Sequence, residues 1–168
     1  MKAIPLLATL VWLCSLSAIS FAQVYQWYNT NIQYSVGTGM TVTVSNQQEL
    51  QMVCPSNMCV FIVKVWNDPD FRDPADIARR LFEATPGEEH HTLTTGYNHG
   101  VQQTGLENQM VSGTVVFNGY TVKAIAYAFK DPEANQIVTA EYRYTLGVND
   151  ASYESHAQSL FNSFRKVH

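Results

Sequence analysis

The sequence lacks the short motifs that mark the common enzyme classes. It contains no glycine-rich nucleotide loop, no phosphate-binding loop, no His-Glu-x-x-His pair and no Gly-x-Ser-x-Gly elbow. A Ser-His-Asp triad is recognised by its geometry, so the sequence neither indicates nor excludes one. We therefore assign no catalytic residue, and we favour a binding protein over an enzyme.

Charge is scarce as well, and positive charge more so than negative. Charged residues make up 14% of the chain, with 10 basic and 14 acidic side chains and no long Lys/Arg run. Proteins that bind nucleic acid or anionic membranes carry a basic surface. This composition argues against both partners.

Only the N-terminus carries a long apolar run. Lys2 precedes an apolar or small stretch over residues 3–16, and Ser20 and Ala22 place small residues where a signal peptidase cuts. The run is too short for a stable membrane span. We predict a signal peptide over residues 1–22, a single domain over residues 23–168, and a secreted or periplasmic protein. No Asn-x-Ser/Thr sequon occurs, which favours a bacterial origin.

Cysteine is rare, with three residues in the chain, and Cys14 belongs to the predicted signal peptide. Cys54 and Cys59 remain, and an even pair in an exported protein predicts a disulfide. Its short loop would contribute only about 2 kcal/mol, so it would act as a local staple. A redox-active pair is the alternative, although such motifs usually hold two residues between the cysteines.

The first half of the domain reads as short strands followed by a helix. Apolar and β-branched residues mark strands near residues 31–36, 40–44, 50–53 and 60–66, the last of them central. Asp73 and Pro74 predict a helix start. Ile77, Leu81 and Ala84 would form its buried face, with Phe82 at the edge.

The second half gives the clearest pattern. Asn118-Gly119 between residues 110–117 and 120–129 predicts a tight hairpin, and residues 137–145 follow as a third strand. In that strand Thr139, Glu141 and Arg143 are predicted to face away from the core. A helix capped by Asp150 ends the chain. The order indicates an α+β fold, an antiparallel β-sheet flanked by helices.

This order of elements resembles the Mog1/PsbP-like α/β/α sandwich family. The resemblance rests on the helix at residues 73–84, the strands at 111–129 and 137–145, and a final helix ending in residues 159–164, Ser-Leu-Phe-Asn-Ser-Phe. It implies an antiparallel sheet between helices. It also implies a non-enzymatic binding or accessory role, because most members of the family have one.

One irregular stretch, residues 85–105, holds the residue types that bind metals. Carboxylates and imidazoles are good ligands for zinc, and they occur here as Glu88, His90, His91 and His99. Adjacent histidines on an extended chain point to opposite faces, so only one of His90 and His91 could join His99. The alternative is a solvated polar loop that includes an edge strand. We predict no cofactor beyond a weakly bound divalent metal.

Aromatic residues offer a second candidate surface. Tyr25, Trp27, Tyr28 and Tyr97 could form a partner-binding patch, because aromatic side chains are enriched at interfaces. We therefore predict an accessory protein that binds a protein or a cell-envelope component. A metal-dependent hydrolase that uses the loop from Glu88 to His99, and a small-ligand carrier, are the alternatives.

Overall fold

The computed structural model describes residues 23–26, 30–37, 39–66, 73–96, 105–134, 136–147 and 149–167, with side chains omitted for residues 92–96. The predicted signal peptide, Trp27, Tyr28, Tyr97 and His99 lie outside these ranges.

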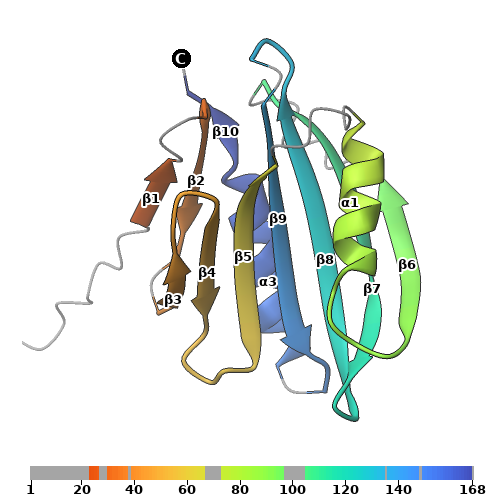
Figure 1. Cartoon of the computed structure of the whole chain (residues 1–168). Helices are drawn as coiled ribbons and strands as arrows, with labels where there is room; N and C mark the ends of the chain where they lie inside the picture. Colours follow the sequence, from red (N-terminus) through yellow and green to blue (C-terminus); the bar gives the residue numbers. More distant parts are fainter. Residues whose placement is uncertain are drawn as a thin grey trace, which may run out of the picture.

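Ten described strands form two sheets (Figure 1). The larger is a seven-stranded antiparallel sheet in the order β3-β4-β5-β9-β8-β7-β6, and the smaller has the order β1-β2-β10. The strands are β1 (Gln23–Gln26), β2 (Ile32–Val36), β3 (Thr41–Ser45), β4 (Glu49–Val53), β5 (Cys59–Trp66), β6 (His90–Gly96), β7 (Glu107–Phe117), β8 (Tyr120–Asp131), β9 (Gln136–Thr145) and β10 (Arg165–Lys166).

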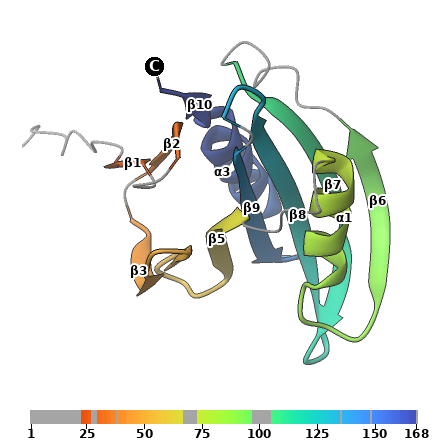
Figure 2. The ribbon, with the colours of Figure 1, turned by 45° about the horizontal axis from the view of Figure 1, so that its top comes forward.

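Two helices cover opposite faces of the large sheet (Figure 2). Helix α1 (Pro74–Glu83) packs on β7 and β8, and helix α3 (Asp150–Asn162) packs on the other side. The predicted α+β fold with an antiparallel sheet between helices is therefore confirmed. None of the helices in the described ranges is long and apolar enough to cross a membrane.

The core on the α3 side is aromatic. Phe161 of α3 lies 4.4 Å from Tyr127 between ring centroids, and Phe164 stacks on Phe129 at 4.1 Å. Phe164 also stacks on Tyr34 of β2 at 4.8 Å, which joins the small sheet to the same core. The alternating apolar residues of β5, β8 and β9 supply the rest of this layer. The whole α3 side is thus one continuous core.

Helix α1 starts where the sequence predicts it, and its buried face is shifted from the predicted one towards Phe82. Asp73 caps it by accepting a 2.9 Å hydrogen bond from the amide of Ala75. Ile77 is buried as predicted, with Ala78 and Phe82. Leu81 is half-buried against the same cluster, whereas Ala84 is exposed. Phe82 can take the centre because it faces Gly113, where a Cβ would collide with its ring.

The turn between β7 and β8 and the connection into α3 are also determined by residues close together in the sequence. Asn118 (φ 50°) and Gly119 (φ 78°) make the predicted hairpin turn, which places Phe117 opposite Tyr120. The N-cap of α3 is Asn149 in the left-handed region, so the prediction of Asp150 is wrong by one residue. Asp150 instead accepts a 2.9 Å hydrogen bond from the amide of Gly147, which fixes the connection into the helix.

Candidate functional site

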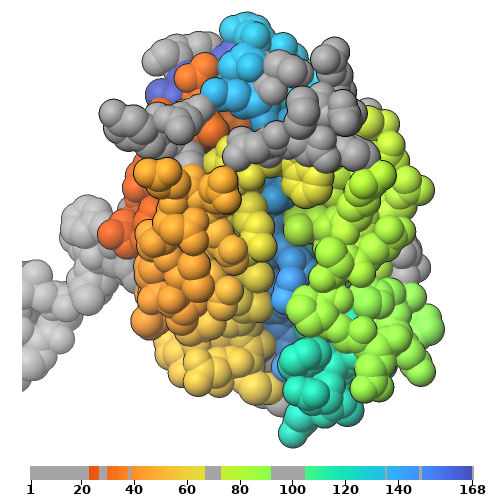
Figure 3. Space-filling model, viewed as in Figure 1, coloured from red at the N-terminus to blue at the C-terminus, as the bar shows by residue number. Residues whose placement is uncertain are grey.

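Helix α1 covers only one half of its side of the sheet. It contacts β7, β8 and β9, whereas the outer face of β3, β4 and β5 has no helix over it in the described structure. Figure 3 shows the result as a hollow between the yellow and orange residues of β3–β5 and the green residues of α1, with blue β9 at its floor. The hollow runs along the strands.

An apolar pocket of about 240 Å³ lies at one end of this hollow. We call it the sheet-end pocket. Four segments far apart in the sequence form it: the β4–β5 turn, the end of α1, the β7–β8 hairpin and the end of β9. Its lining residues are Val53, Asn57, Met58, Cys59, Val60, Thr85, Pro86, Phe117, Val122, Arg143, Tyr144 and Thr145.

Two exposed aromatic residues stand beside the sheet-end pocket. Phe117 is 44% exposed and Tyr120 is 65% exposed, and they face each other across the hairpin tip. Phe117 lies two residues after buried Val115, so both rings project on the α1 side of the sheet. The sequence places aromatics on either side of the Asn-Gly turn. This arrangement is visible in the sequence, where it predicts a hairpin but not an exposed aromatic surface.

The floor beside the pocket holds a buried ion pair. Glu141 is 1% exposed and accepts hydrogen bonds from Arg143, Nε to Oε1 at 2.6 Å and Nη2 to Oε2 at 2.5 Å. Thr85 donates a third bond to Oε1 at 2.5 Å. The prediction that Glu141 faces solvent is wrong, because Thr85 at the end of α1 covers it. Thr139 is buried on the same face.

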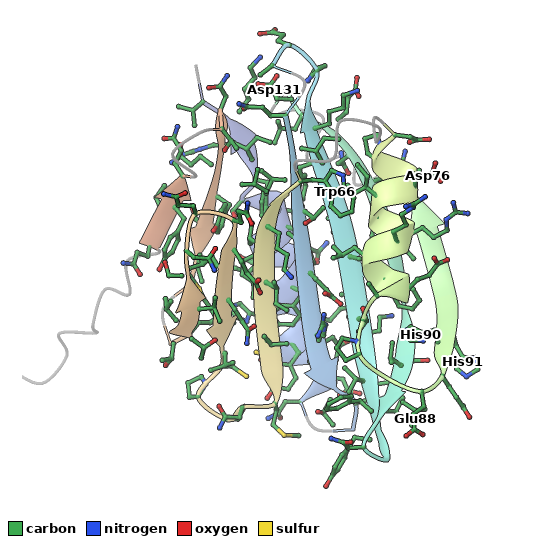
Figure 4. All side chains as sticks on the ribbon, viewed as in Figure 1. Trp66, Asp76, Glu88, His90, His91 and Asp131 are labelled. Carbon is green, nitrogen blue, oxygen red and sulfur yellow. The ribbon has the colours of Figure 1, made fainter. Side chains whose placement is uncertain are left out.

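The predicted metal ligands that the structure describes do not converge. His90 Nε2 lies 2.8 Å from the carbonyl of Thr85, and its ring packs edge-on against Phe82. His91 Nε2 lies 3.6 Å from Glu89, and Figure 4 shows the two histidines directed to different sides of β6. No group of three potential ligands occurs among the described residues.

Because His99 lies outside the described ranges, the metal hypothesis stays a prediction. Glu88 is exposed, and its amide bonds to the carbonyl of Val116 at the edge of the sheet. The expectation of an edge strand in this stretch is met by β6, which pairs with β7 and lies at the edge of the sheet that the described residues form.

Of the predicted aromatic patch, the structure describes Tyr25 alone. Its ring stacks on Tyr34 at 5.7 Å, and it is half-buried within β1. Tyr142 and Tyr144 belong to the core, as their alternation in the sequence indicates. His156 is a half-buried residue of α3, and its Nδ1 lies 3.0 Å from the hydroxyl of Tyr142. Burial lowers its pKa.

Cys54 and Cys59 are close together, and instead of the predicted disulfide the structure holds two free, buried thiols. The amide of Cys54 donates to the carbonyl of Cys59 at 3.1 Å, and the amide of Cys59 donates to Cys54 Sγ at 2.9 Å. Both side chains point into the α3-side core. The turn between them forms a wall of the sheet-end pocket on the opposite face.

Solved structures of Mog1 share this fold. The Ran-binding protein Mog1p of Saccharomyces cerevisiae superposes with a TM-score of 0.59 at 14% identity, over 88% of this chain and 96% of that one. A point mutant of protein Mog1 gives 0.58 with the same identity and coverage. LpqN, involved in cell envelope biogenesis of Mycobacterium tuberculosis, gives 0.46 at 8% identity, over 88% and 86%.

No protein-family model and no curated protein sequence matches the chain. The superposition on Mog1p covers almost the whole of both molecules, so the chain has the Mog1/PsbP-like fold. The resemblance inferred from the order of elements is confirmed at the level of the fold.

Proposed function

We propose that this chain, a Mog1/PsbP-like sandwich, is an exported, non-enzymatic accessory protein that binds another protein through the sheet-end pocket. The observation that carries the proposal is the exposed pair Phe117 and Tyr120 beside an apolar pocket. Large exposed aromatics at the edge of a pocket are typical anchors of protein interfaces. Export is supported by the signal-like pattern of residues 1–22.

The pocket itself favours a protein side chain as its occupant. Pockets that enclose a small organic ligand usually measure about 300–1,000 Å³. The sheet-end pocket, at about 240 Å³, is smaller and suits one apolar side chain of a partner. This size disfavours the sheet-end pocket as the site of a small-ligand carrier. In addition, one protein of the same fold, Mog1p, is a Ran-binding protein.

The buried ion pair in the floor beside the pocket also favours an apolar side chain of the partner. The carboxylate of Glu141 offsets the positive charge of Arg143, and its hydrogen bonds to Thr85 and Arg143 are internal. An approaching group therefore meets a nearly neutral floor with apolar walls such as Val60 and Val122. An apolar or aromatic anchor loses little solvation energy on entering such a site, unlike a charged one.

Capture from a cell-envelope extract tests the proposal. The mature protein and a Phe117→Ser/Tyr120→Ser variant would be immobilised, with Val24→Ser/Val42→Ser as the matched control. Val24 (53%) and Val42 (44%) are exposed apolar residues away from the pocket. We expect a captured protein whose affinity falls at least tenfold, about 1.4 kcal/mol, in the aromatic variant alone.

The comparison of partner capture by the wild type and the two double variants decides whether the partner binds at this surface. A partner retained equally by wild type and both variants, or lost equally from both variants, would overturn the assignment of this surface. Because all four positions are exposed, each variant should keep its fold, and circular dichroism checks this.

A further inference from the structure

The two cysteines occupy a position from which a disulfide can form in place. Cys54 follows β4 and Cys59 begins β5, and the 3.1 Å bond from the Cys54 amide to the Cys59 carbonyl continues the antiparallel register one position past the last pair, Val53 and Val60. Residues opposite each other on antiparallel strands have Cα atoms about 4.5–5.5 Å apart. Disulfides span Cα separations of about 4.4–6.8 Å. The backbone register therefore fits a disulfide, and oxidation requires the Cys54 side chain to turn from the Cys59 amide towards Cys59 Sγ.

The two sulfurs have unequal surroundings. Cys54 Sγ accepts the amide of Cys59 at 2.9 Å and lies 3.3 Å from the hydroxyl of Ser56. Burial acts to raise the pKa of Cys54, but these hydrogen bonds outweigh it and hold the pKa below the ordinary value. Burial, followed by the contact with Cys54, raises the pKa of Cys59 to about 12.

Access is unequal too. Cys54 is 7% exposed and is followed by the exposed residues 55–57, whereas Cys59 is 3% exposed and is preceded by half-buried Met58. Cys59 lies deeper, beside the hydroxyl of Tyr142, which is in turn bonded to His156. A thiol that is more readily ionised and nearer to solvent is the one that starts disulfide exchange.

We propose that Cys54 and Cys59 form a thiol–disulfide exchange site, with Cys54 as the attacking sulfur and Cys59 as the resolving one. The co-reactant is a disulfide, either a small molecule or an oxidoreductase. Cys54 attacks one of its sulfurs and forms a mixed disulfide, and the released thiolate takes the proton of Cys54. Cys59 then attacks Cys54 Sγ, and the second thiolate leaves with the proton of Cys59.

Two thiols of this chain thus lose two electrons and two protons and form one disulfide. One disulfide of the co-reactant is reduced to two thiols. Local opening of the turn admits the co-reactant, because both sulfurs are buried in the closed form. This differs from a permanent staple, since the same steps run in reverse when the surroundings become reducing.

The site is coupled to the sheet-end pocket through the turn, an extension that rests on the proposed function. Asn57 and Met58 line the pocket, and the carbonyl of Met58 accepts a 3.0 Å bond from the amide of Thr145, another lining residue. A bond between Cys54 and Cys59 closes the base of this turn. Oxidation therefore fixes one wall of the pocket.

Oxidised glutathione is the probe for the exchange site, used with wild type, Cys59→Ser and Cys54→Ser. We expect wild type to lose two hydrogens by mass. Cys59→Ser, which keeps Cys54, should form a glutathione adduct at least tenfold faster than Cys54→Ser. Equal rates for the two variants, or a folded wild type that keeps both thiols, would overturn the proposal. Reaction of both variants in denaturant shows that the thiols themselves are competent.

Hydrogen exchange and partner capture test the coupling separately. We expect the amides of Asn57 and Thr145 to exchange more slowly in the oxidised protein, and identical exchange in both forms would overturn the coupling. Loss of partner capture in both redox forms would overturn the proposed function alone, because the glutathione reaction needs no partner.

Discussion

Glu141 and Arg143 lie two residues apart on β9, and their side chains meet in a two-pronged ion pair on the α1 side of the sheet. Neighbours at i and i+2 on a strand share a face, so the pair forms without any change of register. Thr85 closes the third side of the carboxylate. The carboxylate is buried, and the pair holds the end of α1 against the middle of the sheet.

Replacing Arg143 with Met should destabilise the fold. Removal of one partner leaves Glu141 as a buried charge, which costs about 3–5 kcal/mol for a fully buried pair. Because Arg143 is one-fifth exposed, we expect a value near the lower end, measured by urea unfolding. The Glu141→Leu/Arg143→Met double variant should recover most of the loss. A loss below about 1 kcal/mol, typical of an exposed pair, would contradict this interpretation.

Leu160→Ala should show how much the α3 face contributes. Leu160 is buried in the aromatic core, and truncation of a buried leucine costs about 2–5 kcal/mol. The adjacent exposed residue Ser159 provides a control, since Ser159→Ala should change the free energy of unfolding by less than about 0.5 kcal/mol. Similar losses for both variants would mean that the helix face is not what stabilises the fold.

Local patterns in the sequence predicted most of the fold. The Asn118-Gly119 hairpin and the Asp73 cap depend on residues within a few positions of one another, and the structure contains both. The alternation in β9 predicts the buried Tyr142 and Tyr144 correctly, but Thr139 and Glu141 on the other face are buried as well. The burial of Glu141 depends on Thr85, 56 positions away, so an alternation pattern could only predict exposure.

The sheet-end pocket and the small sheet also depend on contacts between residues far apart in the sequence, which local patterns do not predict. The pocket draws its lining from four separate segments, and no spacing in the sequence relates Val53 to Phe117. The small sheet brings β10, near the C-terminal end of the described chain, beside β2 in its N-terminal part. The aromatic residues near the N-terminus are adjacent in the sequence and so predict a patch, whereas Phe117 and Tyr120 form a surface only once the hairpin is placed beside α1.

Tyr34→Phe should leave the protein as stable or make it more stable. The Tyr34 hydroxyl is buried and has no hydrogen-bond partner within the described part of the chain. An unsatisfied buried polar group costs about 1–3 kcal/mol, so its removal relieves a penalty. Tyr142→Phe is the matched comparison, because Tyr142 bonds to His156 and should lose about 0.5–1.5 kcal/mol. A loss for Tyr34→Phe as large as that for Tyr142→Phe would show that its hydroxyl is bonded in solution.

The fold should lose stability in acid through Asp131, which lies at the end of β8 (Figure 4). Burial acts to raise the pKa of Asp131, but hydrogen bonds from Lys166 and from the amides of Glu133 and Ala134 outweigh it and hold the pKa below its ordinary value. A carboxyl with a lowered pKa in the folded state stabilises the fold above its unfolded pKa, about 3.9. That contribution is lost as the pH falls through the lower folded pKa. Urea unfolding should therefore separate wild type from Asp131→Asn near neutral pH, and the two should converge below about pH 4. A wild-type advantage that persists unchanged in acid would contradict the role of Asp131.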